Sequence, residues 1–322
     1  MEKPLVTAMS GVTIACPDPD QLTDLLERIC GWEVVNRGTI DDELESLWKI
    51  AKGSAGNQWV ILRSPKSTRG MIRVVKGIDR ERTRPIGTRW SGVEIVVMHE
   101  IDTLFDKLKD HPAFEVLSPP TTFDFSDVGA NIHRGFHGKG PGKTHLMFTM
   151  EVTKPTGGYD FPSADATVGY IFSVPLVSTE YELSLEFYRD DLGMVPMLTD
   201  RLEDGLWHKV WNLPSGTVVE LSILKGDAPG FGLGGVELQG YDGQHIDPVP
   251  FGFDRFDGGT CLTTYTAENL DQTFKVISES NAAQILSSPT AISQPPYDGL
   301  RAFSFMGISG ERMEITEKGW AP

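Results

Sequence analysis

Hydrophobic and polar positions along the chain repeat in the same order four times. Each repeat has a short apolar strand, a helix with apolar residues at three- and four-residue spacing, a turn, and a second apolar strand. The second strands begin at residues 31, 112, 193 and 281, so successive copies lie 81, 81 and 88 residues apart. A period this regular indicates a duplicated supersecondary unit, here of βαβββ type.

Helix start and stop signals separate the strands of each repeat. In the first repeat, Asp18 and Pro19 supply an N-cap and a first helical residue, and Gly31 permits the left-handed turn that ends the helix. In the second repeat, His111-Pro112 stops the helix. The opening strands are predicted at 11–16, 93–97, 171–177 and 261–265, with a last strand at 312–316.

Composition divides the chain near its middle. Residues 153–165 combine proline and glycine with little apolar periodicity, which is typical of a linker. Because 322 residues suit two domains of about 150 residues each, we expect domains at 1–152 and 166–322 with α+β architecture. The segment 226–259 is rich in glycine and aromatic residues. It is either a cover over a site or an ordered crossing between repeats.

Charge and cysteine usage narrow the classes of partner. The net charge is −16 without a basic run, which argues against nucleic acid and anionic membranes as partners. The three cysteines, Cys16, Cys30 and Cys261, are far apart and are predicted to be reduced thiols rather than a disulfide framework or zinc site. No long apolar run predicts a signal peptide or membrane span, so we expect a cytoplasmic protein that binds a small molecule.

The third repeat carries the most specific motif. The string from Leu185 to Met194, LEFYRDDLGM, resembles the helix-to-strand signature of the vicinal oxygen chelate superfamily. Residues 215–221 and 309–315, each a glycine turn followed by a glutamate, are similar to its closing strand. The resemblance covers all four repeats, and the two-domain layout is most similar to extradiol dioxygenases. It implies curved mixed sheets that form cups. It does not imply one reaction, because the superfamily hosts isomerases, lyases, ring-cleaving dioxygenases and binding proteins.

The resemblance also implies where a metal would lie. In active members a divalent metal in the cup is held by histidines on opening strands and glutamates on closing strands. On this sequence the histidine positions fall on Ser173 and Leu262, and the glutamate positions on Glu220 and Glu314. The first domain keeps no ligand. Without imidazoles an iron site of the facial-triad type is not expected. We therefore predict no cofactor, although a divalent metal (Fe, Mn or Mg) stays open.

Glu220 and Glu314 are expected to share one cup and act as general acid and base. The alternative is that they form structural ion pairs with Arg312 or Lys209. His208 is either a proton shuttle or a surface residue.

The remaining candidates follow from the predicted opening strands and from the aromatic segments. Tyr265 is a further catalytic candidate. The predicted substrate contacts are Ser173, Trp207, Trp211, Phe251, Phe253, Leu262 and Thr264. His133, His137 and His145 lie among glycines and are interpreted as solvated loop residues, with anion binding by that loop left open.

Three functions remain. The first is a lyase or isomerase that uses carboxylate acid–base chemistry on an apolar or aromatic substrate with carbonyl or hydroxyl groups. The second is a ring-cleaving dioxygenase with atypical metal ligands. The third is a non-catalytic binding or resistance protein. A homodimer stays open, since no pattern marks an interface.

Overall fold

The computed structural model describes residues 4–51, 54, 56–78, 90–126, 131–153, 164–203, 208, 211, 213–226, 234–242, 256 and 258–320. Within these residues the four expected βαβββ repeats are present, and the fold is α+β. None of the described helices has the length and apolar composition needed to cross a bilayer.

The first two repeats supply eight strands and three α-helices within the described residues. The elements of the first are β1 (Met9–Cys16), α1 (Pro19–Arg28), β2 (Glu33–Thr39), α2 (Asp42–Trp48), β3 (Gln58–Arg63) and β4 (Met71–Lys76). Those of the second are β5 (Val93–Val97), α3 (Ile101–Leu108), β6 (Glu115–Asp124), β7 (Ile132–Lys139), the 3-10 turn η2 (Pro141–Lys143) and β8 (His145–Thr153).

The last two repeats follow the same order. The elements of the third are β9 (Val168–Val177), α4 (Tyr181–Glu186), the π-helical turn η3 (Phe187–Asp191), β10 (Val195–Glu203), β11 (Val218–Lys225) and β12 (Gly235–Asp242). Those of the fourth are β13 (Gly259–Thr266), α6 (Leu270–Glu279), β14 (Ala283–Ile285), β15 (Thr290–Ala291), β16 (Arg301–Gly307) and β17 (Arg312–Thr316).

Strand pairing joins the repeats differently from their order along the chain. One sheet runs β14-β16-β17-β13-β1-β4-β3-β2, with β15 beside β16, and so combines the first and fourth repeats. The other runs β10-β11-β12-β9-β5-β8-β7-β6 and combines the second and third. The sheets therefore pair the first repeat with the fourth and the second with the third, rather than the first with the second and the third with the fourth as the expected domains imply. The opening strands join the repeats within each sheet, since β1 pairs with β13 and β5 pairs with β9.

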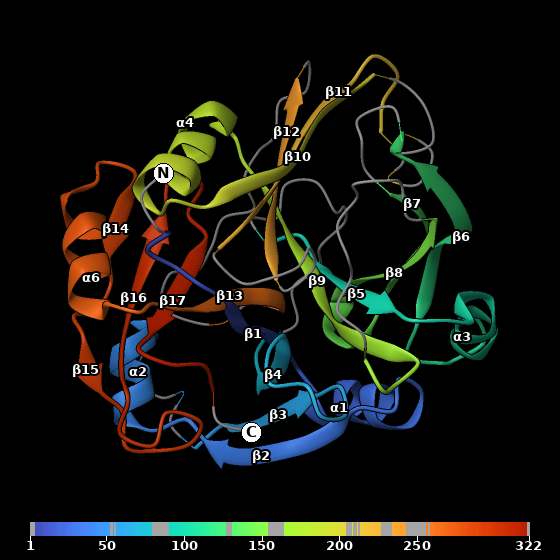
Figure 1. Cartoon of the computed structure of the whole chain (residues 1–322). Helices are drawn as coiled ribbons and strands as arrows, with labels where there is room; N and C mark the ends of the chain where they lie inside the picture. The colour runs from blue at the N-terminus through green and yellow to red at the C-terminus, as the bar shows by residue number, and fades with distance from the viewer. Residues whose placement is uncertain are drawn as a thin grey trace.

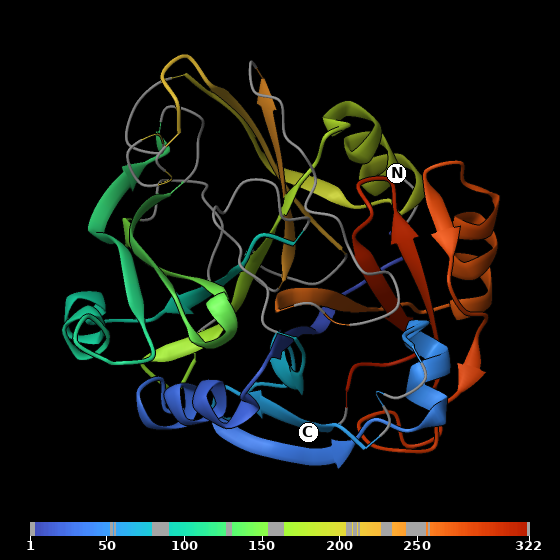
Figure 2. The same cartoon turned by 180° about the vertical axis from the view of Figure 1, so that it is seen from behind.

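The helices lie outside the sheets. Figure 1 and the reverse view in Figure 2 show α1, α3 and α6 at the periphery, with the opening strands in the middle of the molecule. Local signals explain these helices: Asp18 caps α1 and Asn269 caps α6 through their side chains. Buried apolar residues of all four repeats form one continuous core between the sheets and the helices. The central strands are therefore covered by helices on one side, and their other face is left to line a cup.

Two sequence expectations fall on the third repeat. Residues 215–221, interpreted as its closing strand, lead into β11, and the closing strand is β12. Thus residues 235–242 of the expected cover are part of the sheet, while residues 227–233, 243–255 and 257 lie outside the described residues.

Candidate functional site

The sheet of the second and third repeats holds two buried carboxyl groups at the floor of its cup, which we call the Glu94 cup. Glu94 of β5 stands opposite Ser173 of β9 in the strand register, and Glu237 projects from the adjacent β12. Ser173 Oγ lies 2.8 Å from Glu94 Oε2 and 2.7 Å from Glu237 Oε2. A serine hydroxyl has a single hydrogen, so it donates to one carboxyl and accepts from the other. The contacts therefore require a proton on the pair.

The surroundings of the two carboxyl groups affect their pKa values differently. Burial, followed by the charge of Glu237, raises the pKa of Glu94 well above its usual range. Burial also raises the pKa of Glu237, but hydrogen bonds from Ser173, Gln239 and Glu94 oppose that rise. The favoured state has the proton on Glu94 and the negative charge on Glu237. Two carboxyls with different protonation in one cavity can serve as acid and base.

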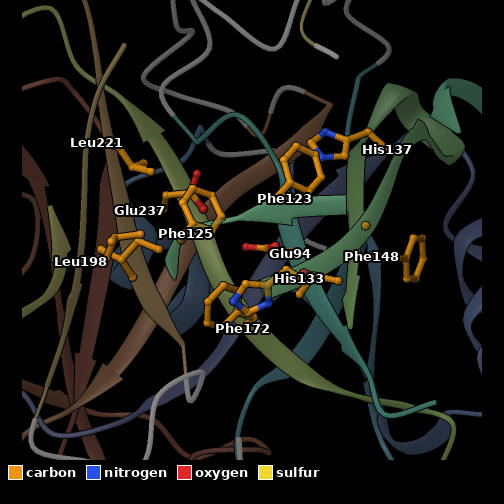
Figure 3. Close-up of a pocket in the computed structure, with 13 residues that line it drawn as sticks. Glu94, Phe123, Phe125, His133, His137, Phe148, Phe172, Leu198, Leu221 and Glu237 are labelled. Atoms are coloured by element: carbon orange, nitrogen blue, oxygen red, sulfur yellow. The ribbon is translucent and has the colours of Figure 1, made fainter. Parts of the chain in front are cut away.

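Apolar and aromatic side chains form the walls above this pair. They enclose a cavity of about 40 Å³, and Figure 3 shows Glu94 among them, with His133 and Phe172 beside it. The apolar lining residues are Phe123, Phe125, Phe148, Phe172, Leu198, Leu221 and Ile223. A cavity of this volume has room for a few water-sized groups. The walls favour neutral apolar ligands.

Two histidines of β7 face the same cavity. His133 and His137 are buried. Burial lowers the pKa of His133 to about 4, and burial together with His145 lowers the pKa of His137 well below its usual value. Both rings are therefore neutral near pH 7. Trp211 donates its indole N–H to His137 Nδ1 over 3.3 Å, which places the proton of this ring on Nε2.

The other sheet forms a second cup with its own buried charged side chains, which we call the Arg73 cup. Glu314 of β17 accepts hydrogen bonds from Trp48 Nε1 at 2.6 Å, Tyr297 OH at 2.8 Å and Thr264 Oγ1 at 3.0 Å. Arg73 Nη2 lies 3.7 Å from Glu314 Oε1, and both side chains are fully buried. The Glu314 carboxyl group thus accepts three hydrogen bonds and lies beside a buried guanidinium.

Aromatic rings close the Arg73 cup. The Arg73 guanidinium carbon lies 4.5 Å from the ring centroids of both Trp48 and Trp320. Trp48 comes from α2, a helix that the sequence analysis did not predict. Cation–π contacts of this kind stabilise a desolvated guanidinium. These contacts therefore stabilise the buried Arg73 side chain.

Solved structures with the same topology identify the fold. No protein-family model and no characterised protein sequence matches the chain. Glyoxalase I from Zea mays is similar with a TM-score of 0.60 and 13% sequence identity over 96% of this chain and 92% of that chain. A Bacillus subtilis protein provisionally described as a dioxygenase gives 0.58 and 12% over 98% of this chain and 86% of that chain. The chain has the fold of the vicinal oxygen chelate superfamily.

The residues expected to act as acid and base do not meet. Glu314 lies in the Arg73 cup, whereas Glu220 is on β11 of the other sheet. Glu220 points outward because its neighbour Leu221 points into the Glu94 cup. It pairs at 3.1 Å with Arg201, and its side chain is 32% exposed, while the expected partner Lys209 lies outside the described residues. The expected shared cup of these two residues is therefore corrected.

Two further catalytic candidates have structural contacts. His208 is buried and its Nε2 contacts the carbonyl oxygen of Thr217, so it is not a surface residue. Tyr265 is buried in the apolar core and donates to the carbonyl oxygen of Gly234. Its ring is packed between core residues and does not face either cup.

The expected substrate contacts divide between the two cups. Ser173 lies at the floor of the Glu94 cup, and Trp211 contacts one of its histidines. Thr264 binds Glu314, and Leu262 is buried in the apolar cluster beside the Arg73 cup. Trp207, Phe251 and Phe253 lie outside the described residues.

Sequence reasoning missed both carboxyl groups of the Glu94 cup. Glu94 and Glu237 are single glutamates inside apolar strands, in the strings VEIVV and VEL, and that pattern was the available signal. His133 and His137 were interpreted as solvated loop residues, but they lie on strand β7. On a strand, residues four apart share a face just as they do on a helix.

The Glu94 cup does not match the metal site of the superfamily. Ser173, which bridges the two carboxyl groups, stands where the resemblance implies a histidine ligand. Among the described residues no group of three or more His, Cys, Asp or Glu side chains is arranged to hold a metal ion. No reaction step through a metal is derived for this cup.

The buried carboxyl pair predicts a pH-dependent stability. Above about pH 4.5 an unfolded chain releases the Glu94 proton, whereas the folded protein keeps it. The free energy of unfolding therefore falls as pH rises, by up to about 1.4 kcal/mol per pH unit for this group, until the folded pKa is passed. Glu94→Gln should reduce this slope in urea unfolding between pH 5 and 8. Glu220→Gln is the matched control and should leave the slope unchanged. Equal slopes in wild type and Glu94→Gln would contradict the proposed protonation.

Proposed function

We propose that the Glu94 cup catalyses proton transfer on a small, neutral, apolar substrate that carries a carbonyl group. The protein would then be an isomerase or lyase of the carboxylate acid–base type. The observation that carries this proposal is that one serine hydroxyl lies within hydrogen-bond distance of both Glu94 and Glu237 at the floor of an apolar cavity. Enzymes that enolise carbonyl compounds need one group that accepts a proton from carbon and one that donates to oxygen.

The chemistry assigns a role to each carboxyl group. The Glu237 carboxylate removes a proton from the carbon next to the carbonyl group, while the Glu94 carboxyl donates its proton to the carbonyl oxygen. The product is the neutral enol, and both carboxyl groups have exchanged protonation states. Return of a proton to a different carbon isomerises the substrate. Loss of a leaving group from the neighbouring carbon instead gives elimination.

The charge of the cup and the residues that line it support a neutral, apolar substrate. An anionic ligand would meet Glu237 in an apolar cavity where its charge is poorly screened, and the chain itself has a net charge of −16. The phenylalanine rings of the wall offer contact to an aromatic or branched aliphatic group. Neutral histidines add hydrogen-bonding groups without adding charge.

Deuterium exchange tests the proposal before the natural substrate is known. A series of neutral ketones from acetone to benzyl methyl ketone is incubated with the protein in deuterated buffer and followed by NMR. We expect deuterium to replace hydrogen next to the carbonyl group faster than in buffer alone. Glu220→Gln should behave as wild type. Saturable binding of these ketones without exchange would support a binding protein, and oxygen consumption would support a dioxygenase.

A further inference from the structure

Three alternating residues of β12 form a hydrogen-bonded line that ends on Glu237. Tyr241 OH donates to Gln239 Oε1 over 2.7 Å, and Gln239 Nε2 donates to Glu237 Oε1 over 2.6 Å. The three side chains are 6%, 2% and 3% exposed, respectively. Residues two apart on a strand share a face, so the line follows directly from the strand.

The two hydrogen bonds orient the Gln239 amide with Oε1 toward Tyr241 and Nε2 toward Glu237. Burial and the charge of Glu237 raise the pKa of Tyr241 well above its usual value, so the phenol keeps its hydrogen. A phenol hydrogen directed at the amide oxygen leaves the amide nitrogen directed at Glu237. That nitrogen can only donate. It therefore favours a carboxylate at Glu237 over a carboxylic acid whose hydrogen faces it.

The other neighbours of the pair do not choose between the two carboxyl groups in this way. Ser173 contacts both of them almost equally. Thr149 bonds to Glu94, but a hydroxyl both donates and accepts and so tolerates either protonation state. Gln239 is the contact that is specific to one carboxyl group and to its charged form.

We propose that Gln239, oriented by Tyr241, is the positioning residue that keeps the negative charge of the carboxyl pair on Glu237 and the proton on Glu94. The identity of Glu237 as the base rests on the function proposed above, but the location of the charge does not. Gln239 acts through Glu237, because Gln239 itself does not line the cavity.

Within the part of the chain that the structure describes, few charged or titratable groups surround Glu237. Glu94 faces it from β5, His133 and His137 face the same cavity from β7, and Tyr241 lies on its own strand. The neighbouring strand β11 presents Leu221 and Ile223, which do not titrate. Both histidines are neutral because burial lowers the pKa of each ring. A neutral amide donor thus has a large share in stabilising the charge.

Carboxyl NMR tests the proposal without any substrate. Protein labelled with ¹³C at the glutamate side-chain carboxyl is titrated, and the two buried signals are assigned by their loss in Glu94→Gln and Glu237→Gln. In wild type we expect a carboxylate signal from Glu237 and a carboxylic acid signal from Glu94 at pH 7. In Gln239→Leu the titration of Glu237 should move up by about 1–2 pH units, the effect expected for one lost hydrogen bond to a charged group.

Tyr241→Phe is the milder second variant. It removes one oxygen and frees the amide to turn, so a smaller upward shift of the Glu237 titration is expected. Tyr181→Phe is the matched control, because the Tyr181 hydroxyl contacts Ser222 and not the carboxyl pair. It should leave both signals unchanged.

The outcomes separate this proposal from the proposed function. Shifts of Glu237 in both Gln239→Leu and Tyr241→Phe support the role of Gln239 even if no ketone is deuterated. If exchange does occur, the acidic limb of its pH–rate profile should move by the same amount in Gln239→Leu. An unchanged Glu237 titration in the two variants, or a wild-type charge on Glu94, overturns the proposal whether or not the ketones react.

Discussion

Glu237→Gln is expected to lower the rate of ketone deuteration about 10²–10⁴-fold, the usual contribution of a positioned general base. Glutamine has nearly the same shape as glutamate and can still accept the Ser173 hydrogen bond, so the cup should keep its form. It cannot take a proton from carbon. NMR rates in deuterated buffer, measured with near- and far-UV circular dichroism as checks on folding, give the effect directly.

Two further glutamate-to-glutamine variants help to interpret a lower exchange rate in Glu237→Gln. Glu220→Gln lies on the outer face of the same sheet and should retain wild-type exchange. Glu94→Gln should also lower the rate, because the amide donates to the carbonyl oxygen but cannot transfer a proton to it. If folded Glu237→Gln exchanges ketone protons as fast as wild type, Glu237 is not the base and the proposed chemistry is lost.

Arg73→Met is expected to destabilise the protein by about 3–5 kcal/mol, as found when one partner of a buried ion pair is removed. The substitution leaves the Glu314 carboxylate buried without its counter-charge. It also removes a guanidinium that lies between Trp48 and Trp320. Methionine has a similar length, so little of the loss comes from an empty space. Urea unfolding at pH 7 measures the change.

Two comparisons separate the charge from the packing. Arg201→Met removes an arginine that also pairs with a glutamate across neighbouring strands, but Arg201 is 52% exposed. Its loss should cost only about 0.2–1 kcal/mol. Arg73→Met combined with Glu314→Gln should be more stable than Arg73→Met alone, because no unpaired charge is left. A cost below about 1 kcal/mol for Arg73→Met would show that the Arg73 cup does not depend on its ion pair.

The assignment of Glu220 to a closing strand shows why such strands are hard to identify from sequence. The string SGTVVEL ends in the same pattern as SGERMEI, yet it leads into the third strand of its repeat. The actual closing strand carries Glu237, within a region where glycines and aromatic residues masked its alternation. If a glutamate is assigned to the wrong strand, or its position is shifted by one residue, its carboxylate is predicted in the cup when it actually faces solvent.

Glu314 shows the complementary problem. Its strand was correctly recognised, and it does point into a cup. The environment of its carboxyl group depends on Trp48 and Arg73, which come from the first repeat, and on Tyr297. No local sequence pattern around residue 314 indicates that these side chains contact Glu314.

The sequence by itself determined the four βαβββ repeats, their helix ends and the superfamily fold, because periodicity, caps and turns act between residues close together in the chain. Ser173 could be placed on an opening strand for the same reason. Only the tertiary structure decided which repeats share a sheet. That choice depends on pairing between β1 and β13 and between β5 and β9, and the repeats offer similar edges for it. The same long-range pairing placed Glu94 and Glu237 beside Ser173, and it placed Arg73 beside Glu314. It therefore separated the Glu94 cup, which carries the candidate chemistry, from the Arg73 cup.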